Sequence, residues 1–206
     1  MDDKINKIIE ESNTPITDKL DILCDEVSIE DGEKIAAKLF RTLTEHSDGI
    51  GLSANQIGIN KRVAVVNVKQ PYHFINPRIV EKSGEVIFME SCLSFPGKIV
   101  RTKRYTSIIV ECDNYESQLY WDVSYDVQQG NYIVNKNVLE CIAVQHEISH
   151  LENRTMFDDE YKQDSIKSDK VYSRNDKVKI TNNIETITVK YKKYDAVYKA
   201  KGYKII

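Results

Sequence analysis

The chain has 206 residues, of which 41% are hydrophobic and 30% are charged, and its formal net charge is −3. This composition is typical of a globular protein and argues against disorder throughout the chain. No apolar run approaches the ~20 residues that a membrane-spanning helix needs. The charged start, Met1-Asp2-Asp3-Lys4, argues against a signal or transit peptide. We therefore expect a cytoplasmic protein with reduced cysteines and no membrane partner.

The net charge hides an asymmetry along the chain. Residues 162–206 hold 12 Lys/Arg against 5 Asp/Glu, a balance of +7, and five of the twelve tyrosines. The remaining 17 Lys/Arg and 27 Asp/Glu give residues 1–161 a balance of −10. A polar stretch, Lys162–Asp176, separates the two parts. The sequence thus predicts a catalytic or binding domain over 1–161 and a basic Tyr/Lys-rich extension over 162–206.

The first half of the chain predicts two helices followed by strands. A short helix is expected near Lys4–Glu11, and Ser28 is placed to cap a second helix over Ile29–His46, where apolar residues recur at helical spacing. Val63–Val68 is a continuous apolar run typical of a buried strand. Further short strands are expected at His73–Asn76, Glu85–Phe88, Ile99–Arg101, Ser107–Cys112 and Leu119–Val127.

The second half predicts one helix and a small β-rich tail. Asn137 and Glu140 form a capping-box-like start for a helix over Val138–Glu152, which Asn153 is suited to end in a left-handed conformation. The tail predicts a hairpin turning at Asn182-Asn183, because asparagine tolerates positive φ. Its other expected elements are strands Val178–Thr181 and Ile184–Lys192, a brief helix Asp195–Lys201 and a strand Tyr203–Ile206. The fold class is α+β, with sheet predominating.

The predicted helix Val138–Glu152 carries the HExxH pattern, His146-Glu147-Ile148-Ser149-His150. Residues four apart share a helix face, so both imidazoles can reach one metal ion. The Glu147 carboxylate lies one step around the helix, where it can contact a metal-bound water. The pattern predicts a metal site, but it identifies neither the third ligand nor the reaction.

Candidates for the third ligand lie on both sides of the pattern. The histidine that metzincins carry six residues after their second motif histidine is absent, since position 156 is Met156. A zincin-like site would draw on a downstream glutamate, Glu160 or Glu185. Upstream, Cys92 lies in a polar turn rather than in an apolar run. The other three cysteines are interpreted as small core residues.

A second unusual segment is the glycine-rich loop Asp48–Gly58. Two glycines flanking Ile50 suit a backbone that must approach a ligand closely. The segment is not a phosphate-binding loop, because it has no Gly-Lys-Ser/Thr and follows no predicted strand. Its small residues would let Gln56 project an amide into a site. The alternative is a plain helix-to-strand turn.

Three segments together resemble the motifs of one family. Gly49–Gln56 resembles GxGLAAxQ, Glu90–Ser94 resembles EGCLS, and Gln145–Leu151 resembles QHExDHL. Their order and approximate separations are those of the peptide deformylases, and the resemblance spans about Pro15 to Asp158. It implies the deformylase fold, in which antiparallel and mixed strands surround a central HExxH helix.

The chain departs from these motifs at several positions. Ser53 and Ser91 replace an alanine and a glycine, Asn153 replaces a frequent glycine, and Ser149 replaces the usual aspartate. None of these is a ligand or the acid/base, although the loss of an aspartate at Ser149 is expected to weaken the orientation of the metal ligands. Asn55, where bacterial members often carry proline, resembles the variants of some bacteriophages.

The resemblance implies a metal-dependent hydrolase. Cys92, His146 and His150 would hold one divalent ion, Fe²⁺ being the usual physiological metal of the family and Zn²⁺, Ni²⁺ or Co²⁺ its substitutes. The metal would lower the pKa of a water, and Glu147 would carry the proton from that water to the leaving amine. The reaction would remove the formyl group from N-formyl-methionyl nascent peptides and release formate.

The resemblance also implies how a substrate is held. The side-chain amide of Gln56 and the backbone N–H of Leu93 would stabilise the oxyanion. The backbone of Ile50-Gly51 would pair with the peptide like an added strand. Leu139 and Ala143 lie on the ligand face of the motif helix and could line a methionine pocket, although core packing explains both equally well.

Two other functions fit part of the sequence. A zincin-like metallopeptidase fits HExxH but lacks a clear downstream ligand. A non-catalytic metal-binding or interaction module would need a fourth protein ligand, as structural zinc sites usually have, and none adjoins the three. For the basic tail, contact with ribosomal RNA is one interpretation, with lysines meeting phosphates and tyrosines stacking on bases. The other is an accessory hairpin whose alternating Ile187, Val189 and Tyr191 pack on the body.

Overall fold

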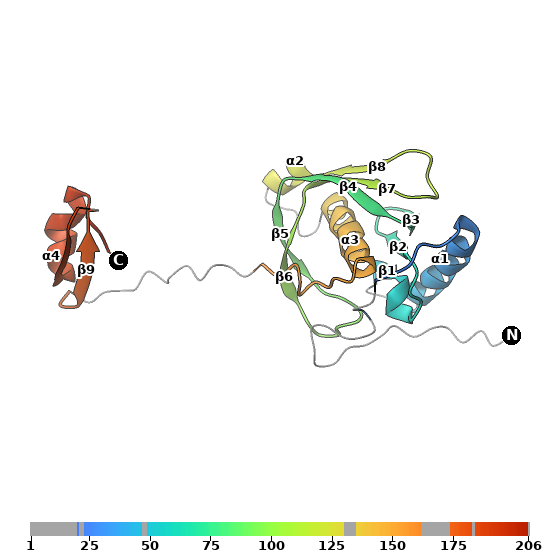
Figure 1. Ribbon diagram of the computed structural model, residues 1–206, viewed down its shortest axis with the longest axis horizontal. Helices are drawn as coiled ribbons and strands as arrows, with labels where there is room; N and C mark the ends of the chain where they lie inside the picture. The colour runs from blue at the N-terminus through green and yellow to red at the C-terminus, as the bar shows by residue number, and fades with distance from the viewer. Residues whose placement is uncertain are drawn as a thin grey trace. The chain divides into compact units, whose positions relative to one another are not determined.

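A computed structural model describes residues 20, 23–46, 49–129, 135–161, 174–182 and 184–205. The predicted helix Lys4–Glu11 and most of the polar stretch Lys162–Asp176 lie outside these residues. The chain forms two compact units, Met1–Tyr161 and Lys162–Ile206 (Figure 1). Both units mix helix and strand, as the sequence predicts for an α+β protein. Among the residues that the structure describes, no helix is long and apolar enough to cross a bilayer.

The first unit surrounds one central helix with antiparallel strands (Figure 1). Its sheets have the orders β1-β2-β3, β4-β7-β8 and β5-β6. The elements are α1 (Ile29–Thr44), β1 (Gly51–Ser53), the 3₁₀ turn η1 (Ala54–Ile57), β2 (Val63–Asn67), β3 (Pro71–Ile75), β4 (Arg78–Ser83), β5 (Val86–Glu90), β6 (Val100–Arg104), β7 (Ser107–Glu111), β8 (Leu119–Asp122), α2 (Ser124–Gln128) and α3 (Lys136–Leu151).

Strand β2 shows why the chain forms layers here. Successive side chains of a strand point to opposite faces, so Val63 and Val65 pack with α1 while Ala64 and Val66 pack with α3. All four side chains are fully buried. This two-sided burial explains the uninterrupted apolar run and confirms the predicted buried strand. Sheet β1-β2-β3 therefore lies between the two long helices (Figure 1).

The two long helices end close to their predicted limits. The Ser28 hydroxyl accepts a hydrogen bond from the backbone N–H of Asp31, as expected for the cap of α1. Helix α3 begins earlier than predicted, because the side chain of Asn135 and not of Asn137 is its cap. Glu140 faces the core instead, where it accepts hydrogen bonds from other elements. Asn153 has φ 64° just after the helix, which confirms the predicted left-handed stop.

Three strand assignments need correction. Strand β1 was not predicted, because its three residues lie in the segment interpreted as a glycine-rich loop. Strand β4 was not predicted, because it is a sheet edge with mostly exposed side chains and shows no apolar alternation. The predicted strand Leu119–Val127 ends at Asp122 and gives way to α2. Asp122 Oδ1 accepts a hydrogen bond from the backbone N–H of Ser124 at 2.9 Å, which turns the chain into the helix. The other predicted strands agree to within a few residues.

The second unit is a small antiparallel sheet of order β10-β9-β11, covered by helical turns. Its elements are β9 (Lys177–Thr181), β10 (Thr186–Lys190), α4 (Tyr191–Lys193), η3 (Tyr194–Tyr198), η4 (Lys199–Lys201) and β11 (Lys204–Ile205). Val178, Ile180 and Tyr203 form its buried cluster. Ile187 and Val189 pack against that cluster, so the predicted hairpin encloses a core within the tail itself.

Candidate metal centre and active site

Three predicted metal ligands converge from two parts of the first unit. Cys92 lies in the turn after β5, while His146 and His150 lie on α3. Cys92 Sγ is 3.4 Å from His150 Nε2, and the two imidazole Nε2 atoms are 3.1 Å apart. Among the described residues, this is the one group of three ligating side chains whose donor atoms all lie within 4.8 Å of one another. All three side chains are buried.

The hydrogen bonds of the two histidines favour a cation between them. His150 Nδ1 lies 3.1 Å from the carbonyl oxygen of Arg154, which can only accept, so Nδ1 carries the proton. His146 Nδ1 lies 2.6 Å from a carboxylate oxygen of Glu90 and also donates. When both rings are neutral, as metal ligands are, the two Nε2 atoms present lone pairs to each other. A metal ion bound by them and by the Cys92 thiolate resolves this conflict, and this donor set suits Fe²⁺, Zn²⁺, Ni²⁺ or Co²⁺.

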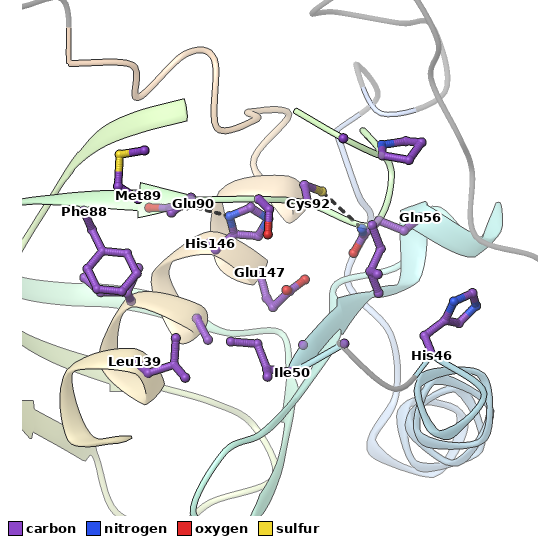
Figure 2. A pocket seen from close by; sticks show the side chains of 18 residues that line it. His46, Ile50, Gln56, Phe88, Met89, Glu90, Cys92, Leu139, His146 and Glu147 are labelled. Carbon is purple, nitrogen blue, oxygen red and sulfur yellow. Dashed lines mark hydrogen bonds and ion pairs between the residues drawn. The ribbon is translucent and has the colours of Figure 1, made fainter. Parts of the chain in front are cut away.

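Glu147 extends from the same helix toward the pocket beside the ligands (Figure 2). Its side chain is buried, and its Oε2 has no hydrogen-bond partner among the described residues. Burial raises the pKa of this carboxyl to about 7. A buried acid that exchanges its proton near neutral pH is suited to carry protons.

Gly51 explains how β1 and α3 approach so closely at this point. A Cβ atom on Gly51 would lie 2.5 Å from Oε1 of Glu147 and 3.0 Å from its Cδ and Cγ. Any larger residue would therefore displace the Glu147 carboxylate. The position of the Glu147 carboxylate thus requires a glycine at position 51. The glycine-rich loop is therefore more than a helix-to-strand turn.

Gln56 directs its amide nitrogen toward the ligands, as the sequence predicts. Its Oε1 accepts hydrogen bonds from the backbone N–H and the hydroxyl of Ser53, both at 2.9 Å. Its Nε2 is thereby turned to donate to Ser94 Oγ at 3.0 Å. The same nitrogen points toward Cys92 Sγ at 3.6 Å (Figure 2). Leu93, the residue after the cysteine, lines the same pocket.

A pocket of about 440 Å³ opens beside the metal ligands (Figure 2). The sequence-predicted substrate residues Ile50, Gly51, Leu139 and Ala143 all line it. Ala143 also packs in the main core, so pocket lining and core packing are both realised for this residue. The pocket wall therefore combines apolar side chains with the carboxylates of Glu90 and Glu147 and with two of the predicted metal ligands, Cys92 and His146.

The family model described as "Polypeptide deformylase" matches residues 6–165, which is most of the chain. The chain belongs to the polypeptide deformylase family. The peptide deformylase of Neisseria gonorrhoeae is 36% identical over 122 residues, which cover 57% of this chain and 65% of that protein. The chain thus spans slightly less than two thirds of the length of this curated relative.

Solved deformylase structures share the fold. A mutant of Arabidopsis thaliana peptide deformylase 1B has a TM-score of 0.61 at 25% identity, covering 76% of this chain and 81% of that chain. The deformylase of the Vibrio parahaemolyticus bacteriophage VP16T, in complex with actinonin, has a TM-score of 0.58 at 28% identity. That similarity covers 72% of this chain and 98% of the phage chain. The similar structures thus include a phage member, the type that Asn55 suggests.

Three cysteines of this deformylase-family chain lie away from the donor group. Burial raises the pKa of Cys24 to about 11 and the pKa values of Cys112 and Cys141 to about 12. All three thiols are buried and protonated at neutral pH. They act as small core residues, as the sequence predicts, and leave Cys92 as the thiol placed to bind metal.

Several residues at this site were not singled out from the sequence. Phe88 and Ile142 contribute apolar pocket wall. The sequence gives Glu90 only as part of a motif and does not predict its partner, Arg104. The available signal is the alternation of β6, whose buried positions Val100 and Thr102 are followed by Arg104. A cation at a buried strand position indicates a buried carboxylate partner.

Proposed function

We propose that this protein hydrolyses the formyl amide of N-formyl-methionyl peptides and releases formate. The observation that supports this best is the buried carboxylate of Glu147. It has an unpartnered oxygen and lies on the wall of a pocket that also holds the Cys92 and His146 donors. A proton carrier beside a metal ligand set, facing a pocket with apolar wall, is what hydrolysis of this amide requires.

In this proposal, Cys92, His146 and His150 hold one divalent ion. That ion supplies an activated water and polarises the formyl carbonyl when bound. Thiolate and imidazole donors suit Fe²⁺, Zn²⁺, Ni²⁺ and Co²⁺. We take Fe²⁺ as the ion used in the cell, because it is the usual metal of the family that the motifs resemble, and the other three as ions able to replace it. Three protein ligands leave a coordination position for water, as in catalytic rather than structural sites.

The remaining steps belong to side chains of the pocket. Glu147 accepts the proton of the attacking water and then donates it to the nitrogen of the departing amine. The amide of Gln56 donates to the oxyanion that develops on the formyl oxygen, and Ser53 keeps that amide in the required orientation. The backbone N–H of Leu93 is the second donor in this proposal.

The peptide is proposed to pair with the free edge of β1. Ile50 O accepts a hydrogen bond from the backbone N–H of Asn67 at 2.8 Å, so the Ile50 backbone points to β2. Backbone groups of consecutive strand residues point in opposite directions, which leaves the N–H and C=O of Gly51 for the peptide. The methionine side chain would lie against Leu139 and Ala143, which offer an apolar wall without charge.

The two alternative functions have less support. Glu160, the nearer downstream glutamate, follows the turn after α3, where its backbone forms a β-bridge with Thr102. Glu185 lies in the second unit and accepts a hydrogen bond from Tyr203. Neither belongs to the ligand group of the described residues, which argues against a zincin-like peptidase. A non-catalytic module leaves without a purpose the buried carboxylate of Glu147, whose Oε2 has no partner among the described residues.

The test is formate release from formyl-Met-Ala-Ser by protein loaded anaerobically with Fe²⁺. We expect turnover with this peptide and none with acetyl-Met-Ala-Ser, because the small formyl group is what the proposed site accepts. Metal content and activity should both be lost in Cys92→Ala. Metal retained in Cys92→Ala, together with cleavage of the peptide's internal amide bonds, would favour the peptidase. A wild-type protein with full metal content and no activity would favour the non-catalytic module.

We further propose that residues 1–161 form the catalytic domain and that residues 162–206 bring it to ribosomal RNA. One face of sheet β10-β9-β11 supports this contact. By strand register, that face carries four lysines and three threonines and no acidic residue: Lys177, Lys179, Thr181, Thr186, Thr188, Lys190 and Lys204. Lysine ammonium groups on one exposed face suit a row of phosphates. Nascent formylated chains leave ribosomes in the cytoplasm of a bacterium, or of the host cell of a phage, which is where we place the protein.

Substituting glutamine for the four lysines of this Lys/Thr face tests the proposal. We expect co-sedimentation with ribosomes at low salt to weaken, and its salt dependence to flatten by about three units of slope. Formate release from the short peptide should stay unchanged. The matched control replaces four lysines of the helical turns, Lys192, Lys193, Lys199 and Lys201. Equal effects of both sets, or no co-sedimentation of the wild-type protein, would show that the face is not an RNA-binding surface.

A further inference from the structure

The metal ligand His146 is held by a buried ion pair. Its Nδ1 lies 2.6 Å from Glu90 Oε2, and Arg104 contacts both oxygens of that carboxylate, from Nε at 2.6 Å and from Nη2 at 2.9 Å. The side chains of Glu90 and Arg104 are each only 4% exposed. Both oxygens of Glu90 accept from the guanidinium, and Oε2 also accepts from the imidazole, so hydrogen bonds hold this carboxylate in one orientation. Glu90 is therefore a carboxylate that fixes the imidazole ring.

The network continues past Arg104 to a second, largely buried carboxylate. Arg104 Nη1 donates to Asp159 Oδ2 at 2.7 Å and to Ser149 Oγ at 3.0 Å. The Ser149 hydroxyl gives its own proton to the carbonyl oxygen of Gln145 at 2.8 Å, so it is an acceptor toward the guanidinium. The Asp159 side chain is 9% exposed. The charge of Arg104 is thus shared between Glu90 on one side and Asp159 on the other.

Asp159 also contacts the segment that holds the second histidine. Its Oδ1 forms an ion pair with the guanidinium of Arg154. The backbone carbonyl of Arg154 accepts the hydrogen bond from His150 Nδ1. One carboxylate therefore contacts both arginines, and each arginine leads to a different metal-ligating imidazole.

We propose that Asp159 is a positioning residue for the metal centre, acting on His146 through Arg104 and Glu90 and on His150 through Arg154. It supplies from the turn after α3 the carboxylate that position 149 of the helix lacks. Ser149 Oγ lies 3.4 Å from Asp159 Oδ2, so a carboxylate at either position can reach Arg104. This inference rests on the proposed metal site, but it is tested by metal binding and not by turnover.

The test is a double-mutant cycle of Asp159→Asn and Ser149→Asp. Asp159→Asn keeps the shape but removes the charge, and we expect the affinity for Zn²⁺, measured by competition with a chelator, to fall about 10- to 100-fold. Ser149→Asp alone places two carboxylates beside each other and should also weaken binding. The double variant restores a single carboxylate beside Arg104, and its Zn²⁺ affinity should return close to the wild-type value. The absorption spectrum of the Co²⁺-loaded protein should change in each single variant and revert in the double one.

The matched control is Asp158→Asn, in the same turn. Asp158 Oδ2 accepts hydrogen bonds from the backbone N–H and the hydroxyl of Thr155. The carboxylates that Arg104 contacts among the described residues are those of Glu90 and Asp159. It should lower the thermal stability of the metal-free protein without changing the Co²⁺ spectrum. Unchanged Zn²⁺ affinity and spectrum in Asp159→Asn, or a double variant that stays weak, would overturn the inference. If Asp159→Asn does not fold, the double variant decides alone: it must bind Co²⁺ with the wild-type spectrum. A wild-type protein that binds metal but releases no formate would contradict the proposed function without contradicting this inference.

Discussion

Replacing Glu147 with glutamine is expected to lower kcat by about 10²- to 10⁴-fold while leaving metal binding intact. Glutamine has the shape of glutamate but cannot accept the proton of the attacking water. The metal donors come from Cys92, His146 and His150, which the substitution does not change. The protein should therefore retain its full content of Fe²⁺ or Co²⁺ and bind substrate without processing it.

The measurement pairs formate release with metal analysis on the same sample. Because the buried Glu147 carboxylate has an oxygen without a partner, removing its charge should leave the metal-free protein at least as stable as the wild type in thermal unfolding. A parallel loss of metal and activity would mean that Glu147 is itself a ligand. Activity within a factor of a few of the wild type would mean that another group carries the proton.

The local parts of this structure could be predicted from the sequence because their signals are short in range. The i, i+4 spacing of His146 and His150 fixes both on one face of α3. The run from Val63 to Val66 predicts a strand buried on both faces, and the glycines around Ile50 predict a close backbone approach. In each case the physical cause lies within a few residues of the effect.

Contacts between distant residues could not be predicted in this way. Glu90 and Arg104 lie on paired strands, and nothing in either local sequence specifies the partner. The cap of α3 shows the same limit, since Asn137 with Glu140 is as good a capping signal as Asn135. Tertiary structure decides between them, because Glu140 accepts a hydrogen bond from Trp121 Nε1 at 3.1 Å. Strand β4 was missed because an exposed edge strand carries no apolar alternation.

The site also shows how departures from a family motif are accommodated. Ser53 replaces an alanine, and its hydroxyl adds a hydrogen bond to Oε1 of Gln56 at 2.9 Å. Ser149 replaces an aspartate, and the charge that it lacks is found on Asp159, 2.7 Å from Arg104. The sequence predicts a weakened orientation of the ligands at this point. In the structure, Asp159 in the turn after α3 supplies a carboxylate to Arg104. This is a tertiary contact that no local sequence pattern indicates.

Replacing Gly51 with alanine is expected to lower kcat by about 10²-fold without loss of metal. The new methyl group would begin 2.5 Å from Glu147 Oε1 and must push the carboxylate away from the pocket. Alanine is favoured over glycine in a strand by roughly 0.5–1 kcal/mol, so the fold itself should not suffer. Formate release, metal content and thermal unfolding of the purified variant check these three expectations.

The same contact gives a second, sharper test by a double-mutant cycle with Glu147→Asp. Aspartate is one methylene shorter, so its carboxylate already lies further from the methyl group at position 51. In the Glu147→Asp background, Gly51→Ala should therefore cost much less activity than it costs in the wild type, and the two effects should not add. Fully additive losses would mean that Gly51 acts through the peptide-binding edge of β1. Loss of metal in Gly51→Ala would instead mean that the β1 backbone supports the ligands, and that the glycine is required for the metal centre rather than for the acid.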